Sequence, residues 1–337
     1  MAKAKRISGL DCSAPADNMV RLVLRTQLKA MCDLRDKALK WNDPEGVHDM
    51  RVGSRRLRST MSDFRSYLRK ANLPRMKLKE IAKRLGDVRD EDVALLALEE
   101  LKAKATEQAA EGIELLVDER REKLKEARSA LQKAIKRSTL DEFRKEFLSK
   151  LRAIAIVPPE KSGRKRANDE PLTFSRMEIE VIGSRLKELK AARRHIYFPF
   201  QIKELHEMRI LAKRLRYAIE LFAFCGNEEL GEIAKEVALM QTSLGEMHDC
   251  DVWIKSLGTQ LKKTAGKDKS GEEHARLRAG TAWLLRHFAV ERMEHYGDAL
   301  ARWQQWETEG FLDKLESILA PHPIPASPED KAHSSPP

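Results

Sequence analysis

The stretch "GVHDMRVGSRRLRS", residues 46–59, has a near copy in "ELHEMRILAKRLRY", residues 204–217. One constant offset aligns His48 with His206 and matches most of the charged and apolar positions that follow. Such a long period differs from the short periods of solenoid repeats. The sequence therefore predicts that each half of the chain builds one copy of the same unit.

A second motif supports the repeat. The segment "LGDVRDEDV" at residues 85–93 corresponds to "LGEMHDCDV" at residues 244–252, at an offset one residue longer than that of the first motif. We expect a helix break at each Leu-Gly step, with the aspartates that follow acting as N-caps of a new helix. The same aspartates are also candidate partners for arginines.

Composition favours an all-α fold. Of 337 residues, 35% are charged and only 6% are aromatic, and apolar residues recur at helical spacing along most of the chain. A helix is expected to begin at Pro44, with Asp43 as its N-cap. We expect two pseudo-symmetric four-helix bundles around a basic central groove or pore.

Two segments rich in proline and charge divide the chain. The stretch "VPPEKSGRKRANDEP" at residues 157–171 has no helical periodicity, and the tail "APHPIPASPEDKAHSSPP" at 320–337 carries too many prolines for a helix. The predicted organisation is a first helical half, a linker, a second helical half and a disordered tail, at residues 15–157, 158–171, 172–318 and 319–337.

The net charge of +11 predicts affinity for polyanions such as nucleic acid, anionic membrane surfaces or phosphate polymers. The cysteines are scattered, without metal-ligand spacing, in a chain large enough to fold without disulfides. No apolar run approaches the length of a signal peptide core or a membrane span. These features favour a soluble protein of the reducing cytoplasm, with no membrane association.

The repeated helix predicts one apolar face and one cationic face. A solvated helix face usually mixes charges, because like charges one turn apart weaken a helix by a few tenths of a kcal/mol. Here no carboxylate interrupts residues 51–58, so an anion is expected to neutralise the stripe. Arginine suits phosphate because its planar guanidinium offers a fork of donors and stays charged. The candidate binding residues are His48, Arg51, Arg55, Arg56, Arg58, His206, Arg209, Lys213, Arg214 and Arg216.

These motifs resemble the two halves of a CHAD domain, the conserved histidine α-helical domain, over roughly residues 15–318. The resemblance implies two four-helix bundles around a basic pore, binding of inorganic polyphosphate, and recruitment to polyphosphate granules. The second copy departs from the first where His248 replaces Arg89. The family's basic motif positions correspond to His48, Arg51, Arg55, Arg58, His206, Arg209, Lys213 and Arg216.

Several alternatives stay open. Nonspecific, weak nucleic-acid binding needs the same cations, although aromatic residues are scarce near the stripe and Tyr217 is the nearest candidate for base stacking. A module that docks an acidic protein and an accessory module that handles metal or phosphate are further possibilities. Metal binding is disfavoured, because no histidine-plus-carboxylate spacing is evident around either histidine. Catalysis is disfavoured too, since no base or nucleophile is placed beside them. We therefore predict a binding protein without cofactor or metal, whose affinity weakens from about pH 6 to 8 as the histidines lose charge.

Overall fold

The computed structural model describes residues 7–68, 72–153, 172–223, 228–264 and 271–320. Within these ranges the chain is helical, with one isolated β-bridge between Pro15 and Thr173. The predicted all-α class is therefore confirmed. The predicted linker, 158–171, and nearly all of the predicted tail, 319–337, lie outside the described residues.

The described part of the first half forms six helices. Their bounds are α1 Ala16–Asp33, α2 Arg35–Ala38, α3 Pro44–Asp63, α4 Arg75–Lys102, α5 Glu107–Ala134 and α6 Arg137–Arg152. In the second half, the residues that the structure describes form five α-helices and one 3-10 helix. Their bounds are α7 Phe174–Ala191, η1 Arg193–Tyr197, α8 Ile202–Phe222, α9 Glu228–Thr264, α10 Glu272–Thr308 and α11 Phe311–Ile318.

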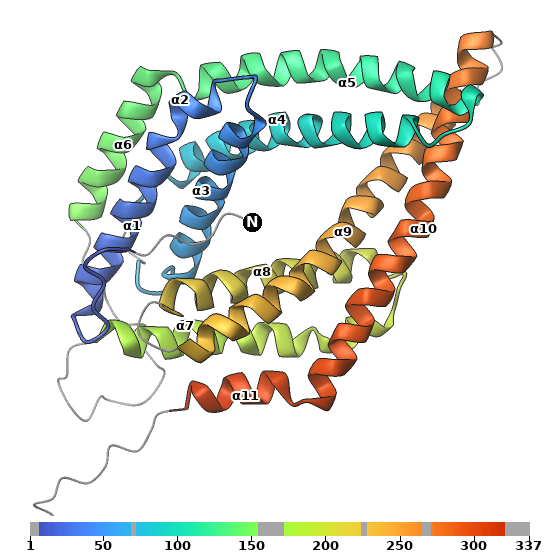
Figure 1. Ribbon diagram of the computed structural model, residues 1–337. Helices are drawn as coiled ribbons and strands as arrows, with labels where there is room; N and C mark the ends of the chain where they lie inside the picture. Colours follow the sequence, from blue (N-terminus) through green and yellow to red (C-terminus); the bar gives the residue numbers. More distant parts are fainter. Residues whose placement is uncertain (1–6, 69–71, 154–171, 224–227, 265–270, 321–337) are drawn as a thin grey trace, which may run out of the picture.

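The helices form a four-sided outline (Figure 1). Helices α4 and α5 run together along one side, and α9 and α10 pack together along the next. Helices α7, α8 and α11 lie on the third side, while α1, α3 and α6 lie on the fourth. The repeated motif helices α3 and α8 contact each other, and α5 contacts α10 at a distant corner.

Helix α3 begins as predicted. The Asp43 side chain accepts a hydrogen bond from the Glu45 backbone N–H, and Pro44 occupies the first turn, where its missing N–H costs nothing. The apolar faces of α3 and α8 are buried, including Met50 and Leu57 on α3 and Met208 on α8. Burial of these faces orients both cationic faces away from the core.

The predicted helix breaks at the Leu-Gly steps are wrong. Helix α4 continues through Gly86 and α9 continues through Gly245, so the aspartates that follow lie inside helices and cap nothing. At Gly86 the physical reason is visible, since an added Cβ would lie 3.4 Å from Arg51 Nη1. The glycine leaves room for an arginine of the stripe against the backbone of α4. At Gly245 a Cβ would meet nothing within 4 Å.

Both hydrophobic cores draw residues from the two halves. The larger core joins Phe64 of α3 to Phe174 and Phe222 of the second half through edge-on ring contacts at 6.3 and 6.4 Å. The smaller core packs Ile113 of α5 with Leu284 of α10. Two equivalent bundles therefore stay an interpretation of the repeat, because the apolar packing is shared between the halves.

The cysteines depart from expectation at one position. Cys12 is disulfide-bonded, whereas Cys32 and Cys250 are buried free thiols. Large size removes the need for a disulfide but does not prevent one.

A separate finding concerns membranes. No helix in the described ranges combines the length and the apolar character that a membrane crossing requires.

Candidate anion-binding site

The two motif helices meet along their cationic faces. The guanidinium of Arg55 on α3 lies over the ring of Tyr217 on α8, 5.6 Å from its centroid. One residue further along α3, Arg56 Nη2 lies 3.8 Å from Glu220 Oε2. These contacts place residues that are far apart in sequence on opposite sides of one junction.

Positive charges crowd this junction. Burial lowers the pKa of Lys213 to about 8, and neighbouring charges act in the same direction, namely those of Arg209, Arg55, Arg214 and Arg58. A lysine pKa is lowered in this way where an ammonium group is half desolvated among like charges. The cations of α3 and α8 are therefore close enough to repel one another.

Arg209 has the same environment. Burial lowers its pKa, and the charges of Arg55 and Arg51 lower it further, whereas Asp249 opposes them. Arginines and lysines of both halves thus converge at the α3–α8 junction. We call this group the cationic cluster, and it consists of Arg51, Arg55, Arg58, Arg209 and Lys213.

Most of the cationic cluster has no counter-ion. Within the described ranges, Arg55, Arg58, Arg209 and Lys213 form no ion pair, and the buried Nε atoms of Arg55 and Arg209 form no hydrogen bond. A buried guanidinium donor without an acceptor costs free energy. This arrangement is consistent with a site that an anion completes.

Arg51 differs from its neighbours, because α4 neutralises it. Its Nη1 donates to Asp90 Oδ1 at 2.6 Å and to the Gly86 carbonyl at 3.0 Å. The suggestion that the aspartates pair with stripe arginines is thus confirmed at Asp90. The pair is largely exposed, so it contributes about 0–1 kcal/mol and an incoming anion can compete for the arginine.

The histidines lie beside the cluster. His206 Nδ1 and His248 Nδ1 are 3.0 Å apart, so one ring must donate and the other accept. Burial, then Arg209 and His206, lower the pKa of His248 to about 4, and burial and Arg209 also lower the pKa of His206. In the first half, burial and Arg89 lower the pKa of His48. The free protein therefore keeps all three largely neutral at neutral pH, and the histidine titration expected between pH 6 and 8 moves to lower pH.

Two predicted residues, Arg56 and Arg216, have polar partners, and a third, Arg214, lies between Lys213 and an acidic residue. Arg216 is buried, and it donates to Glu220 at 2.6 Å and to Gln241 at 3.2 Å. Arg56 also approaches Glu220, while the charge of Arg214 reaches the buried Asp63. Arg56 thus joins α3 to α8 and Arg216 joins α8 to α9, roles that the predicted cationic face did not distinguish from ligand binding.

Base stacking has little support at this site. Tyr217 is only 6% exposed, and guanidinium groups of Arg55 and Arg216 both lie 5.6 Å from its ring centroid. Its ring is therefore engaged in intramolecular cation–π contacts.

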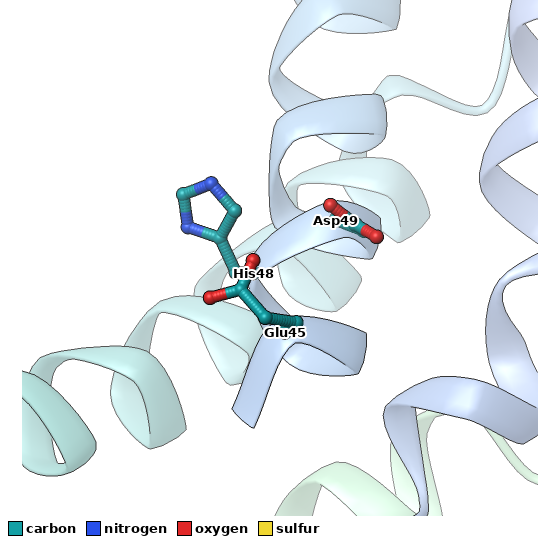
Figure 2. A group of neighbouring side chains, drawn as sticks. All are labelled: Glu45, His48 and Asp49. Carbon is teal, nitrogen blue, oxygen red and sulfur yellow. The ribbon is translucent and has the colours of Figure 1, made fainter. Parts of the chain in front are cut away.

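The sequence reading missed one possible ligand set. Glu45, His48 and Asp49 lie on one side of the first turns of α3, with ligand atoms within 4.8 Å of one another (Figure 2). The expectation that no carboxylate spacing surrounds a histidine was therefore wrong at His48. Lys37 Nζ already donates to Asp49 Oδ2 at 2.9 Å. We assign no metal there, because the ammonium group of Lys37 already binds the Asp49 carboxylate and the charges of nearby arginines disfavour a cation.

Sequence reasoning also missed the partners of Arg216. Glu220 lies one turn further along α8 and Gln241 on α9, and nothing in their local sequence distinguishes them from solvated residues. The repeat did indicate the aspartate positions of α4 and α9, but their helical context could be established only from the fold.

Comparison with known proteins agrees with the repeated motifs. The sequence model of the CHAD domain matches residues 22–258. The chain belongs to the CHAD family. No curated protein matches this CHAD-family chain significantly.

Solved structures show the same fold at low sequence identity. The crystal structure of the CHAD domain from the plant Ricinus communis has a TM-score of 0.67 and 20% identity, covering 90% of this chain and 96% of that one. PptA from Streptomyces chartreusis has a TM-score of 0.60 and 17% identity, covering 86% of this chain and 100% of that one. The CHAD fold therefore accommodates this chain almost throughout.

Proposed function

We propose that this CHAD-family protein binds inorganic polyphosphate at the cationic cluster and associates with polyphosphate granules. The observation that carries the proposal is the gathering of Arg55, Arg209 and Lys213 from two helices, with no ion pair to any of them among the described residues. In this proposal the protein acts by binding and has no catalytic role.

A phosphate polymer suits such a cluster for electrostatic reasons. Each cation that meets a phosphate releases condensed counterions, which produces strong and salt-dependent binding without base recognition. Arg55 and Arg209 can each direct two N–H donors at phosphate oxygens. Weak, nonspecific nucleic-acid binding uses the same electrostatics, but the covered ring of Tyr217 offers no stacking surface.

The histidines add a pH-dependent contribution to the proposed function. Phosphate near His48, His206 or His248 would favour the protonated ring, opposing the burial and arginine charges that lower these pKa values. Binding should therefore be accompanied by proton uptake, most strongly below about pH 6.5.

A competition titration tests the proposal. Labelled long-chain polyphosphate would be displaced by unlabelled polyphosphate, single-stranded DNA, duplex DNA or tRNA, at fixed salt and matched phosphate concentration. We expect polyphosphate to compete orders of magnitude better than any nucleic acid. Equal competition by all four polymers would show that the cluster is a generic cationic surface without selectivity for polyphosphate.

Matched variants locate the binding. The cluster variant carries Arg55→Gln, Arg209→Gln and Lys213→Gln, and should lose at least about tenfold in affinity. The control variant carries Lys104→Gln, Lys133→Gln and Lys145→Gln, which removes as many exposed lysines that form no ion pair within the described residues. Unchanged binding in the folded cluster variant would overturn the proposed function.

A further inference from the structure

A large cavity opens at the end of α3, beyond the motif residues. Its volume is about 1040 Å³, and its walls come from the end of α3, the segment at 65–68, the start of α4, and α7. Ser62 follows Arg58 by one turn on the same face of α3, and Arg65 lies in the turn just after the helix ends, so positive charge continues from α3 into this cavity. The cavity therefore adjoins one end of the cationic cluster.

The cavity carries cations that lack partners. Arg65, Arg75 and Lys187 all line it, and none of them forms an ion pair within the described ranges. Arg75 makes one long hydrogen bond, at 3.4 Å, to the Met61 carbonyl. Burial lowers the pKa of Arg75, and the charge of Arg65 lowers it further, so the two guanidinium groups lie near each other.

The carboxylates in the cavity wall are already occupied. Asp63 accepts from Arg185 Nε at 2.9 Å, and Glu180 Oε2 accepts from the Tyr67 hydroxyl at 2.6 Å. Arg185 is in turn held by Glu188. Asp63 and Arg185 therefore offset each other, and the three remaining cations, Arg65, Arg75 and Lys187, outnumber the one remaining carboxylate, that of Glu180.

Hydroxyl donors complete the lining. Ser62, Ser66 and Ser184 border the cavity, and their side chains form no hydrogen bond with other described residues. Gly183 adds space, because a Cβ at this position would meet nothing within 4 Å. Guanidinium, ammonium and hydroxyl donors around an open volume are the groups that bind phosphate oxygens.

We propose that this cavity is a second phosphate-binding site, which holds another part of the polyphosphate chain bound at the cationic cluster. The inference rests on the proposed function. From Arg51 to Asp63, where the helix ends, α3 extends about 18 Å at 1.5 Å per residue, and Arg65 lies in the turn that follows. A long polymer can contact both regions at once, and the second contact then becomes intramolecular and raises the overall affinity. A short oligomer, such as inorganic triphosphate, contacts only one region.

Three variants of the full chain separate the two sites. The cavity variant carries Arg65→Gln, Arg75→Gln and Lys187→Gln, and is compared with the cluster and control variants defined above. All three change the net charge by the same amount. Affinity for long-chain polyphosphate and for inorganic triphosphate would be measured at several salt concentrations, with circular dichroism as a check of folding.

We expect the cavity variant to lose about tenfold in affinity for long chains, with a log–log salt dependence shallower by up to about 3. Its loss for triphosphate should be smaller, because the cluster stays available. Long-chain binding equal to that of the control variant would overturn the second site, even if the cluster variant fails to bind. An unaffected cluster variant would instead overturn the proposed function. If the cavity variant unfolds, Ser184→Glu and Lys187→Glu are tested singly, and full long-chain affinity in both would again exclude the site.

Discussion

At the scale of single residues, the buried charge of Lys213 should lower the stability of the free protein. Burial and the surrounding arginines lower its pKa in the folded protein to about 8, from 10.5 in an exposed lysine. Below about pH 8 the folded state must hold a charge that the unfolded chain accommodates more easily. The penalty fades as pH rises from about 8 to 10.5, so Lys213 should make the free protein more stable with rising pH over this range.

Replacing Lys213 with methionine should therefore stabilise the protein at pH 7 while weakening polyphosphate binding. We expect a gain of about 1–2 kcal/mol in the free energy of unfolding, after discounting the pKa shift for solvent screening. Urea denaturation at pH 7 and at pH 10.5 measures the gain, which should shrink at the higher pH. Lower stability at pH 7 would show that Lys213 is neutralised within the free protein.

At the scale of elements, two glycines set the crossing of α5 and α10. A Cβ on Gly112 would lie 1.9 Å from the Arg276 carbonyl oxygen, and a Cβ on Gly280 would lie 2.6 Å from the backbone of Gly112. Backbone atoms cannot move aside as flexible side chains can. The close approach of the two helices therefore depends on the absence of side chains at both positions.

The Gly112→Ala variant should lose about 2 kcal/mol or more of stability, because the α5–α10 contact must open. Gly297→Ala on the exposed face of α10 is the matched control, since its Cβ would meet nothing within 4 Å. This control should gain about 0.5–1 kcal/mol from helix propensity. Thermal unfolding of both variants measures the difference, and equal stability in the two would contradict the close crossing.

At the scale of the whole molecule, the shared cores couple the two halves. The ring contacts of Phe64 with Phe174 and Phe222 cross between the halves, and the smaller core joins α5 to α10. The cationic cluster spans the same division. A ligand at the cluster is therefore expected to bind and stabilise the entire chain rather than one half.

Because the two hydrophobic cores of the described residues combine side chains from both halves, the protein should unfold in one cooperative transition. Tryptophan fluorescence reports mainly on the second half, through residues such as Trp303 and Trp306, while circular dichroism reports on all helices. The two urea curves should coincide, and long-chain polyphosphate should shift both equally. Two separated transitions would show that the halves fold independently.

Much of the fold follows from local sequence. The Asp43–Pro44 signal determines where α3 begins, and the apolar residues of α3 and α8 determine which faces are buried. The prediction of helix breaks at the Leu-Gly steps was wrong. A glycine that ends a helix and a glycine that leaves room for a neighbouring arginine look alike in sequence. Only the contact between Arg51 and Gly86 distinguishes them.

The sequence by itself determined the helical class, the repeat and the cationic face carried by each motif helix, because periodicity and charge are local properties of the chain. Only the tertiary structure decided which cations are neutralised. Arg51 meets Asp90 and Arg216 meets Glu220 and Gln241, whereas Arg55 and Arg209 form no ion pair among the described residues. Electrostatic pairing depends on distance in space and on desolvation, and for most of these residues the neighbours that set both come from other helices.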